Sequence, residues 1–179
     1  MKLRIIILLV LFSSLRICFS QSVDCFITKQ FNVSIFPASY EAKGLYLDYF
    51  KRFTPIRFEV IEAEGLLKKQ IKKIVKSSLD KNSLFRVKHS HKVYRRLRHY
   101  NRLYFGYINE SGERVLMIEA RWIDRENFKE CETEYDYIFH GGASIWNIEF
   151  NLNTKTFSGF GTHDNLGYFN SKTVNEKSC

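Results

Sequence analysis

The stretch from Leu103 to His163 constrains the fold most, because it contains four short runs of strand-like sequence separated by turn signals. Residues 109–112, Asn-Glu-Ser-Gly, suit a hairpin turn, and Gly141-Gly142 marks a second turn. After the first turn, apolar residues from Leu116 to Trp122 alternate with mostly polar ones, as in a strand with one buried face. We therefore predict a four-stranded antiparallel meander.

One amphipathic helix is predicted before the meander, at about residues 57–78. Thr54 and Pro55 form a helix-start signal, because a hydroxyl cap is followed by proline at the first helical position. Apolar residues then repeat at intervals of three and four, which places them on one stripe of a helix. They are Val60, Ala63, Leu67, Ile71, Ile74 and Val75. Five lysines occupy much of the remaining surface: Lys68, Lys69, Lys72, Lys73 and Lys76.

The predicted fold class is α+β, with one main helix packed on the four-stranded antiparallel meander, because neither element can bury its apolar surface alone. A cystatin-like arrangement is the first choice, and a cone-shaped fold like that of nuclear transport factors is the alternative. Residues 31–35 suggest a further edge strand, residues 40–53 a short helix, and residues 124–133 a charged surface loop. The strand at Tyr104 to Tyr107 has aromatic residues on both faces, so a partner or a second copy would cover one face.

The first twenty residues have the anatomy of a cleaved secretory signal. Lys2 and Arg4 precede an apolar run of eight residues, 5–12, which is too short to span a bilayer, and Ser20 is a small residue before the expected cleavage site. An uncleaved anchor is the alternative reading. The predicted organisation is a signal peptide at 1–20, a single domain at 21–163 and a flexible tail at 164–179. We expect a secreted or periplasmic protein without a transmembrane span.

The chain is basic, with a formal net charge of +9. Export argues against nucleic acid as the partner, so the charge is expected to serve solubility or attraction to an anionic envelope surface or an unknown protein. Basic residues are dense between residues 84 and 102, where a short helix or turn is predicted to lead into the meander. The candidates for contact with a partner are Arg95, Arg96, Arg98 and Arg102.

Three cysteines would remain after removal of the signal: Cys25, Cys131 and Cys179. An oxidising compartment makes one disulfide plausible, and an odd number leaves one cysteine over. We predict the pair Cys25–Cys131, because Cys179 is the last residue, although sequence does not fix connectivity.

Few residues suggest catalysis or metal binding. Asp136 and His140 would share a strand face and are candidates for an acid–base pair. His89 and His91 are candidate metal ligands, since residues two apart on a strand share a face. Neither pair has a supporting motif, so we prefer the interpretation that these are ordinary solvated polar residues. We predict no cofactor and no metal.

Two segments carry a resemblance to a known group of proteins. Residues 100–114 pair an aromatic-rich strand with the Asn-x-x-Gly turn, and residues 140–152 follow a Gly-Gly turn with alternating aromatics. Together they resemble small exported proteins of Gram-negative, Bacteroidetes-type bacteria, over roughly residues 54–163. The resemblance implies export and a similar fold, but that family has no assigned activity and no catalytic residues to transfer. Its members often have Asp before the Gly-Gly pair, where this chain has His140.

The sequence leaves three hypotheses about function. The first is a secreted, non-enzymatic binding or structural domain, which the missing catalytic motifs favour. The second is a small hydrolase or ligand-processing enzyme, which requires Asp136, His140 and a third polar group to meet in one pocket. The third is an inhibitor or immunity-type partner protein, by analogy with what cystatin-like folds can do.

Overall fold

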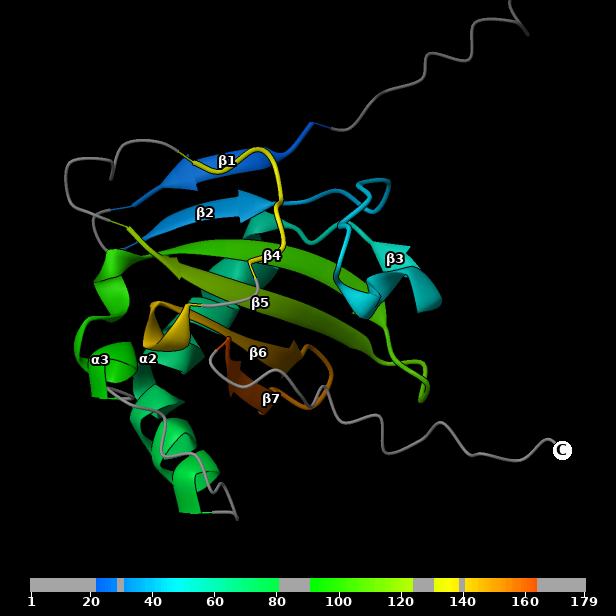
Figure 1. Cartoon of the computed structure of the whole chain (residues 1–179). Helices are drawn as coiled ribbons and strands as arrows, with labels where there is room; N and C mark the ends of the chain where they lie inside the picture. Colours follow the sequence, from blue (N-terminus) through cyan, green and yellow to red (C-terminus); the bar gives the residue numbers. More distant parts are fainter. Residues whose placement is uncertain (1–21, 29–30, 81–90, 124–130, 139–140, 164–179) are drawn as a thin grey trace, which may run out of the picture.

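A computed structural model of the chain describes residues 22–28, 31–80, 91–123, 131–138 and 141–163, and these form an α+β domain with one long helix and a mixed sheet of seven strands (Figure 1). The elements are β1 (Asp24–Ile27), β2 (Asn32–Ile35), η1 (Tyr46–Tyr49), β3 (Arg52–Phe53), α2 (Arg57–Asp80), α3 (His91–Arg95), η2 (Leu97–His99), β4 (Tyr100–Ile108), β5 (Arg114–Trp122), η4 (Gly142–Ser144), β6 (Ile145–Asn151) and β7 (Thr156–Thr162). The α+β class with one main helix is confirmed. The predicted signal peptide and tail lie outside the described residues.

The sheet is larger than the predicted meander. Its strands follow the order β1-β2-β4-β5-β6-β7, and β3 pairs with β4 beside this path. Strands β4 to β7 are antiparallel neighbours in sequence order, but β2 pairs with β4 in parallel. The prediction of four antiparallel strands is therefore incomplete, because the segment before α2 contributes three more strands. The predicted edge strand at 31–35 is β2, which lies between β1 and β4 instead of at the edge.

The hairpin between β4 and β5 forms where Asn109 and Gly112 predicted it. Gly112 adopts φ +77°, a left-handed conformation that glycine adopts without steric cost. The side-chain oxygen of Asn109 accepts a hydrogen bond of 2.8 Å from the backbone N–H of Glu113. These local interactions fix the register in which Leu116 pairs with Gly106.

Helix α2 covers one face of the sheet, and the apolar stripe identified in the sequence is the part that packs. Its buried members contact residues of the sheet in one core cluster that includes Tyr104, Ile118 and Trp146. The helix begins at Arg57, as predicted, and the side chain of Glu59 accepts the N–H of Ile56 at 3.1 Å. The hydroxyl of Thr54 accepts the N–H of Ala38 at 3.0 Å.

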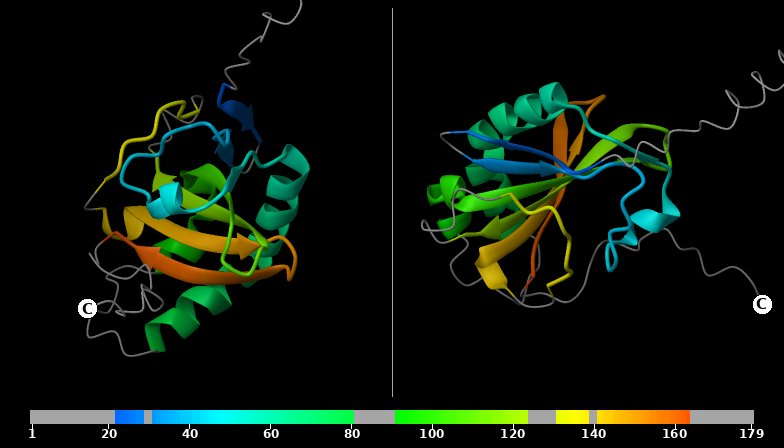
Figure 2. Two further views of the ribbon diagram at one scale, coloured as in Figure 1. Left: turned by 90° about the vertical axis from the view of Figure 1, so that its right-hand side faces the viewer. Right: turned by 90° about the horizontal axis from the view of Figure 1, so that it is seen from above.

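The opposite face of the sheet is covered by the chain's own irregular segments, residues 36–50 and 131–138 (Figure 2, right view). Phe36 stacks on Phe105 with ring centroids 4.6 Å apart, and Tyr135 meets the same ring edge-on at 5.2 Å. This second core explains why β4 has aromatic residues on both faces. The predicted helix at 40–53 is only the short η1, followed by strand β3.

No helix of the described part of the chain combines the length and the apolar character needed to cross a bilayer.

Candidate functional site

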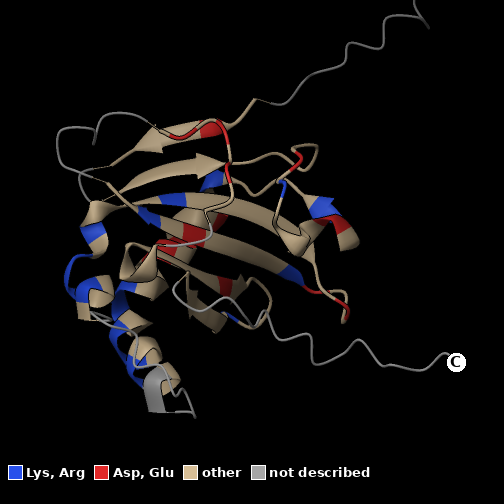
Figure 3. Cartoon of the chain, viewed as in Figure 1, with Lys and Arg blue, Asp and Glu red and all other residues tan. Residues whose placement is uncertain are grey.

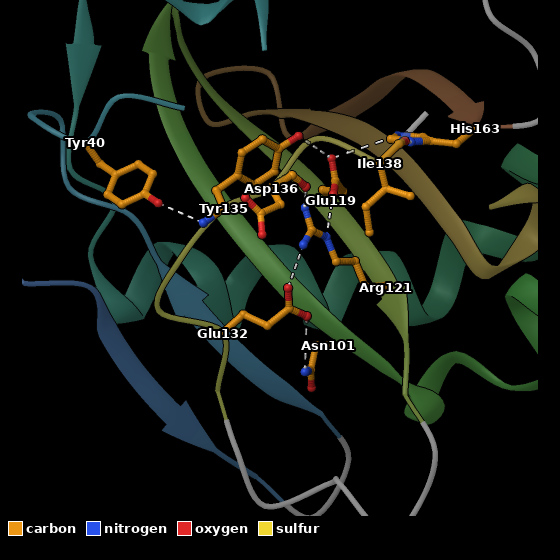
Figure 4. Close-up of polar contacts among 9 residues, drawn as sticks. All are labelled: Tyr40, Asn101, Glu119, Arg121, Glu132, Tyr135, Asp136, Ile138 and His163. Carbon is orange, nitrogen blue, oxygen red and sulfur yellow. Dashed lines mark hydrogen bonds and ion pairs between the residues drawn. The ribbon is translucent and has the colours of Figure 1, made fainter. Parts of the chain in front are cut away.

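The densest group of buried ionisable side chains lies on the sheet face opposite α2. Glu119 and Arg121 are two residues apart on β5 and therefore point to the same face. Glu132 and Tyr135 come from the covering segment 131–138, and His163 follows β7. We call these five residues the Glu119 cluster (Figure 4).

Glu119 is the centre of this cluster and is fully buried, with 0% of its surface exposed. One of its carboxylate oxygens accepts a hydrogen bond from Nε of Arg121 at 2.7 Å, and the other accepts one from the hydroxyl of Tyr135 at 2.9 Å. Nε2 of His163 lies 3.9 Å from the second oxygen, and its Nδ1 contacts the carbonyl oxygen of Ile138. Both carboxylate oxygens are thus occupied by neighbouring side chains.

Arg121 joins the sheet to the covering segment. Besides Glu119, it donates a hydrogen bond to Glu132 and one to the backbone carbonyl of Asp136, both at 2.7 Å. Glu132 also accepts a hydrogen bond from the amide of Asn101 on β4, at 3.4 Å. A guanidinium with several charge-assisted hydrogen bonds holds its partners in a fixed geometry. The cluster therefore fastens segment 131–138 to β4 and β5.

Burial and charge shift the pKa values within the cluster in directions that keep it intact. Burial, and then the neighbouring carboxylate of Glu119, raise the pKa of Tyr135 well above its usual range. Burial alone would lower the pKa of Arg121, but the charges of Glu119 and Glu132 outweigh it and raise that pKa. At neutral pH, Tyr135 is a hydrogen-bond donor and Arg121 is a cation.

Only one of the two residues predicted as an acid–base pair, Asp136, lies in the described structure. Asp136 reaches the Glu119 cluster through its backbone carbonyl, while the residue as a whole is exposed. His140 lies outside the described residues. Glu119, which sequence reasoning assigned to a polar strand face, is the carboxylate at the centre instead. The signal that would have found it is the aromatic content of β4, because aromatic residues on both strand faces require a cover on both.

A second buried ion pair lies under α2. Arg102 on β4 is 1% exposed, and its Nε lies 3.0 Å from a carboxylate oxygen of Glu64, as an ion pair without hydrogen-bond geometry. The hydroxyl of Tyr104 donates to the same oxygen at 2.8 Å, and Arg102 also donates to the carbonyl of Leu97 at 2.7 Å. The burial of Arg102 corrects the prediction that it contacts a partner. Alternation along β4 turns its side chain into the core, where it cannot reach a partner.

The other predicted arginines lie on an exposed surface. Arg95 ends α3, Arg98 lies on η2 and Arg96 lies between them. All three are exposed, and α3 packs against α2. Exposed lysines of α2 adjoin them, and Figure 3 shows both sets of basic residues gathered on the two helices. We call this the basic surface, which consists of Lys69, Lys72, Lys73, Lys76, Arg95, Arg96 and Arg98.

The lysines of the basic surface lie together with Ser77 on one open stretch of the α2 surface. The sequence from Leu66 to Ser78 contains five lysines and no acidic residue, and the sequence from His91 to His99 contains four basic residues and no acidic one. An anionic ligand would meet a field of one sign here.

Only one of the two candidate metal ligands lies in the described structure, whereas both cysteines of the predicted disulfide do. His91 lies on α3, whereas His89 and Cys179 are outside the described residues. Within the described ranges, no group of three or more His, Cys, Asp or Glu residues has the arrangement of a metal site. The disulfide prediction is confirmed, since Cys25 on β1 is bonded to Cys131 with a Cα–Cα distance of 6.1 Å.

Comparison with known proteins finds no relative. A scan against protein-family models gives no match, and searches of curated proteins and of solved structures give none either.

Proposed function

We propose that the chain is an exported, non-enzymatic binding domain that holds an anionic ligand on its basic surface. The observation that carries the proposal is the concentration of exposed lysine and arginine side chains on α2 and α3. Isolated cations are common on protein surfaces, but a one-signed patch raises the local concentration of an anionic partner and speeds its association. The predicted contact residues Arg95, Arg96 and Arg98 belong to this patch.

The Glu119 cluster supports a non-enzymatic reading. A general acid or base needs an atom available to the substrate, at hydrogen-bonding distance. Both oxygens of Glu119 already accept hydrogen bonds, from Arg121 and Tyr135. These contacts tie down segment 131–138, which is a structural use of the charges. The hydrolase alternative and the inhibitor or immunity-type alternative stay predictions, as does the cystatin-like arrangement.

Export to an oxidising compartment is part of the proposal. It is supported by the disulfide between Cys25 and Cys131, because such bonds persist mainly outside the reducing cytosol. The resemblance to small exported proteins of Gram-negative bacteria points the same way. A secreted or periplasmic location would place the basic surface near anionic envelope components.

Heparin-agarose chromatography tests the proposed function, because heparin is a soluble polyanion that presents only charge. We expect the protein to be retained at about 0.15 M ionic strength and to elute as screening shortens the Debye length below about 8 Å. The variant K72E/K76E removes two cations from the patch and should elute at clearly lower salt. The same is expected of R95E/R98E.

The matched control is K43E/K51E, which makes the same change in net charge at two exposed lysines outside α2 and α3. If the control lowers the eluting salt as much as K72E/K76E does, binding reflects net charge and the basic surface is not the site. Failure of the wild-type protein to bind heparin at low salt would refute the proposed function outright.

A further inference from the structure

A continuous exposed stripe runs along α2 on the side away from the sheet. Its members are three or four residues apart and are all exposed, which places them along one line of the helix. We call it the outer stripe, and it consists of Phe58, Ile61, Gly65, Lys69, Lys72 and Lys76. At 1.5 Å per residue the stripe is about 27 Å long.

The two ends of the outer stripe differ in chemistry. Its first turns expose Phe58 at 74% and Ile61 at 56%, and Ile56 just before the helix is 58% exposed. Gly65 follows, with nothing within 4 Å of the position where a Cβ would lie. The later turns carry the lysines of the basic surface. Large apolar side chains beside a one-signed charged patch are a mark of an interaction surface.

The apolar end is not explained by the protein's own core. The core stripe of α2 already faces the sheet through Val60, Ala63 and Leu67, all fully buried. Phe58 and Ile61 lie on the opposite side of the same turns. Two acidic residues lie between them and the lysines: Glu62 is paired with Lys155 at 2.6 Å, and Glu64 is buried against Arg102.

From this arrangement we propose that the partner of the outer stripe is an anionic lipid bilayer, with Ile56, Phe58 and Ile61 entering the interface and the lysines of α2 contacting the headgroups. The inference rests on the proposed function, since it names the anionic ligand of the basic surface. A soluble polyanion would use the lysines and arginines but gain nothing from exposed Phe and Ile. A bilayer offers both negative charge and an apolar layer beneath it, which is how amphipathic helices bind at interfaces.

The shape of the surface agrees with a flat partner. A stripe about 27 Å long on one helix can meet a membrane along its length, because lysine side chains reach the headgroups while their stems lie along apolar surface. Gly65 has no side chain that would hold the middle of the helix away. Helix α2 would lie in the plane of the interface and would not cross it, consistent with the four lysines in its second half.

Vesicle co-sedimentation tests the inference. The full chain is mixed with vesicles of phosphatidylcholine alone or with about one-third phosphatidylglycerol, and every variant keeps the same first 21 residues, so any contribution of that segment cancels. We expect binding to the anionic vesicles and little to the neutral ones. Since each lysine near an anionic surface contributes about fivefold to binding, K72E/K76E should weaken it by at least about 25-fold, and K43E/K51E should change it little.

The variant F58Q/I61Q separates a membrane from a soluble polyanion. It should weaken binding to anionic vesicles by about 10-fold or more and leave the salt at which the protein elutes from heparin unchanged, because heparin has no apolar layer. These two positions are exposed, so their replacement by glutamine leaves the core intact. Unchanged vesicle binding in F58Q/I61Q would overturn the inference.

A fluorescent reporter adds a readout of insertion. The variant Phe58→Trp should shift its emission to shorter wavelength, relative to the wild type, when anionic vesicles are added, and brominated lipids should quench it. Retention on heparin without vesicle binding would overturn the bilayer as partner and leave the proposed function standing. Loss of both heparin binding and vesicle binding would refute the proposed function as well as the bilayer inference.

Discussion

The two faces of the sheet are closed by different kinds of interaction. One face is covered by regular helices, with the apolar stripe of α2 packing on Ile118 and Trp146 and with Val93 of α3 in the same core. The other is covered by irregular segments 36–50 and 131–138, held by stacked aromatic rings, a disulfide and the Glu119 cluster. A helix brings its own backbone hydrogen bonds to the sheet, whereas an irregular cover must obtain its order from specific long-range contacts. The second face should therefore depend on a few residues more strongly than the first.

The largest effect is expected from removing the disulfide. It closes a loop with a sequence separation of 106 and ties β1 to the start of segment 131–138. For a loop of that size the chain-entropy model gives a loss of about 4.7 kcal/mol in the free energy of unfolding. Urea unfolding of C25S/C131S measures it, with Cys179→Ser as the control that should leave stability unchanged. A loss below about 1 kcal/mol would mean that the irregular cover does not need this bond.

The next largest effect is expected from Glu119→Ala. The substitution leaves Arg121 buried without its main counter-charge and the hydroxyl of Tyr135 without an acceptor. Breaking a buried ion pair in this way costs about 4 kcal/mol. Glu110→Ala, at an exposed glutamate in the turn between β4 and β5, is the matched control and should cost less than about 0.5 kcal/mol.

The double variant E119L/R121M sharpens this result. Replacing both charges by apolar side chains removes the unpaired cation, so much of the lost stability should return. Hydrogen exchange should nevertheless remain faster in segment 131–138 than in the wild type, because Arg121 also donates to the carbonyl of Asp136. Full recovery of protection in that segment would show that the cluster does not order the cover.

The difference between a regular and an irregular cover also explains how well each face could be predicted from the sequence. The apolar repeat from Val60 to Val75 is local, so it predicted α2 and its packing side correctly. The pairing of Cys25 with Cys131 was predicted by elimination among three cysteines. The second face has no such periodic signal, because its cover consists of segments separated by about ninety residues in sequence, as the hydrogen bond between Tyr40 and Tyr135 illustrates with a separation of 95.

Glu119 and Arg121 show most clearly why the second face could not be predicted from the sequence. Polar residues alternating with Leu116, Ile118 and Ala120 are what a solvent-facing strand surface requires, and they were interpreted in that way. The same alternation fits a face where charges are buried against one another, and the sequence of β5 alone does not distinguish these cases. Arg102 is the corresponding case under α2. Its burial follows from the register of β4, which depends on β2 and β5 and not on local composition.

The helical face should respond to loss of packing volume rather than loss of charge. Leu67→Ala removes a fully buried side chain from the contact between α2 and the sheet, and we expect a cost of about 3 kcal/mol. Lys72→Ala, at an exposed position of the same helix, should cost less than about 0.5 kcal/mol. Urea unfolding measures both. In the double variant L67A/E119A the two costs should add within about 0.5 kcal/mol if the faces are energetically separate, and strong coupling would contradict that separation.

The smallest effect is expected from alkaline pH, and it reaches both faces. Burial, followed by a neighbouring carboxylate, raises the pKa of Tyr135 on one face and of Tyr104 on the other. Since each pKa is higher in the folded state than the value of about 10 in the unfolded chain, the stabilisation is fully present below pH 10 and is lost as pH rises from there toward the folded-state pKa. Each tyrosine should contribute a loss of about 1.4 kcal/mol per pH unit in that window.

Comparing Tyr135→Phe with Tyr104→Phe shows which face of the sheet is responsible for the stability lost at alkaline pH. Each variant lacks one titrating hydroxyl, so its free energy of unfolding should fall less than that of the wild type between pH 10 and 11, by about 1 kcal/mol. Tyrosinate absorbance at equilibrium follows the ionisation directly. If the irregular cover opens before global unfolding, the hydroxyl of Tyr135 will ionise while the helical face is still folded, and Tyr135→Phe will then leave the slope unchanged while Tyr104→Phe reduces it. Equal reductions in both variants would instead show that the two covers open together, and the regular and irregular faces would form one cooperative unit despite their different construction.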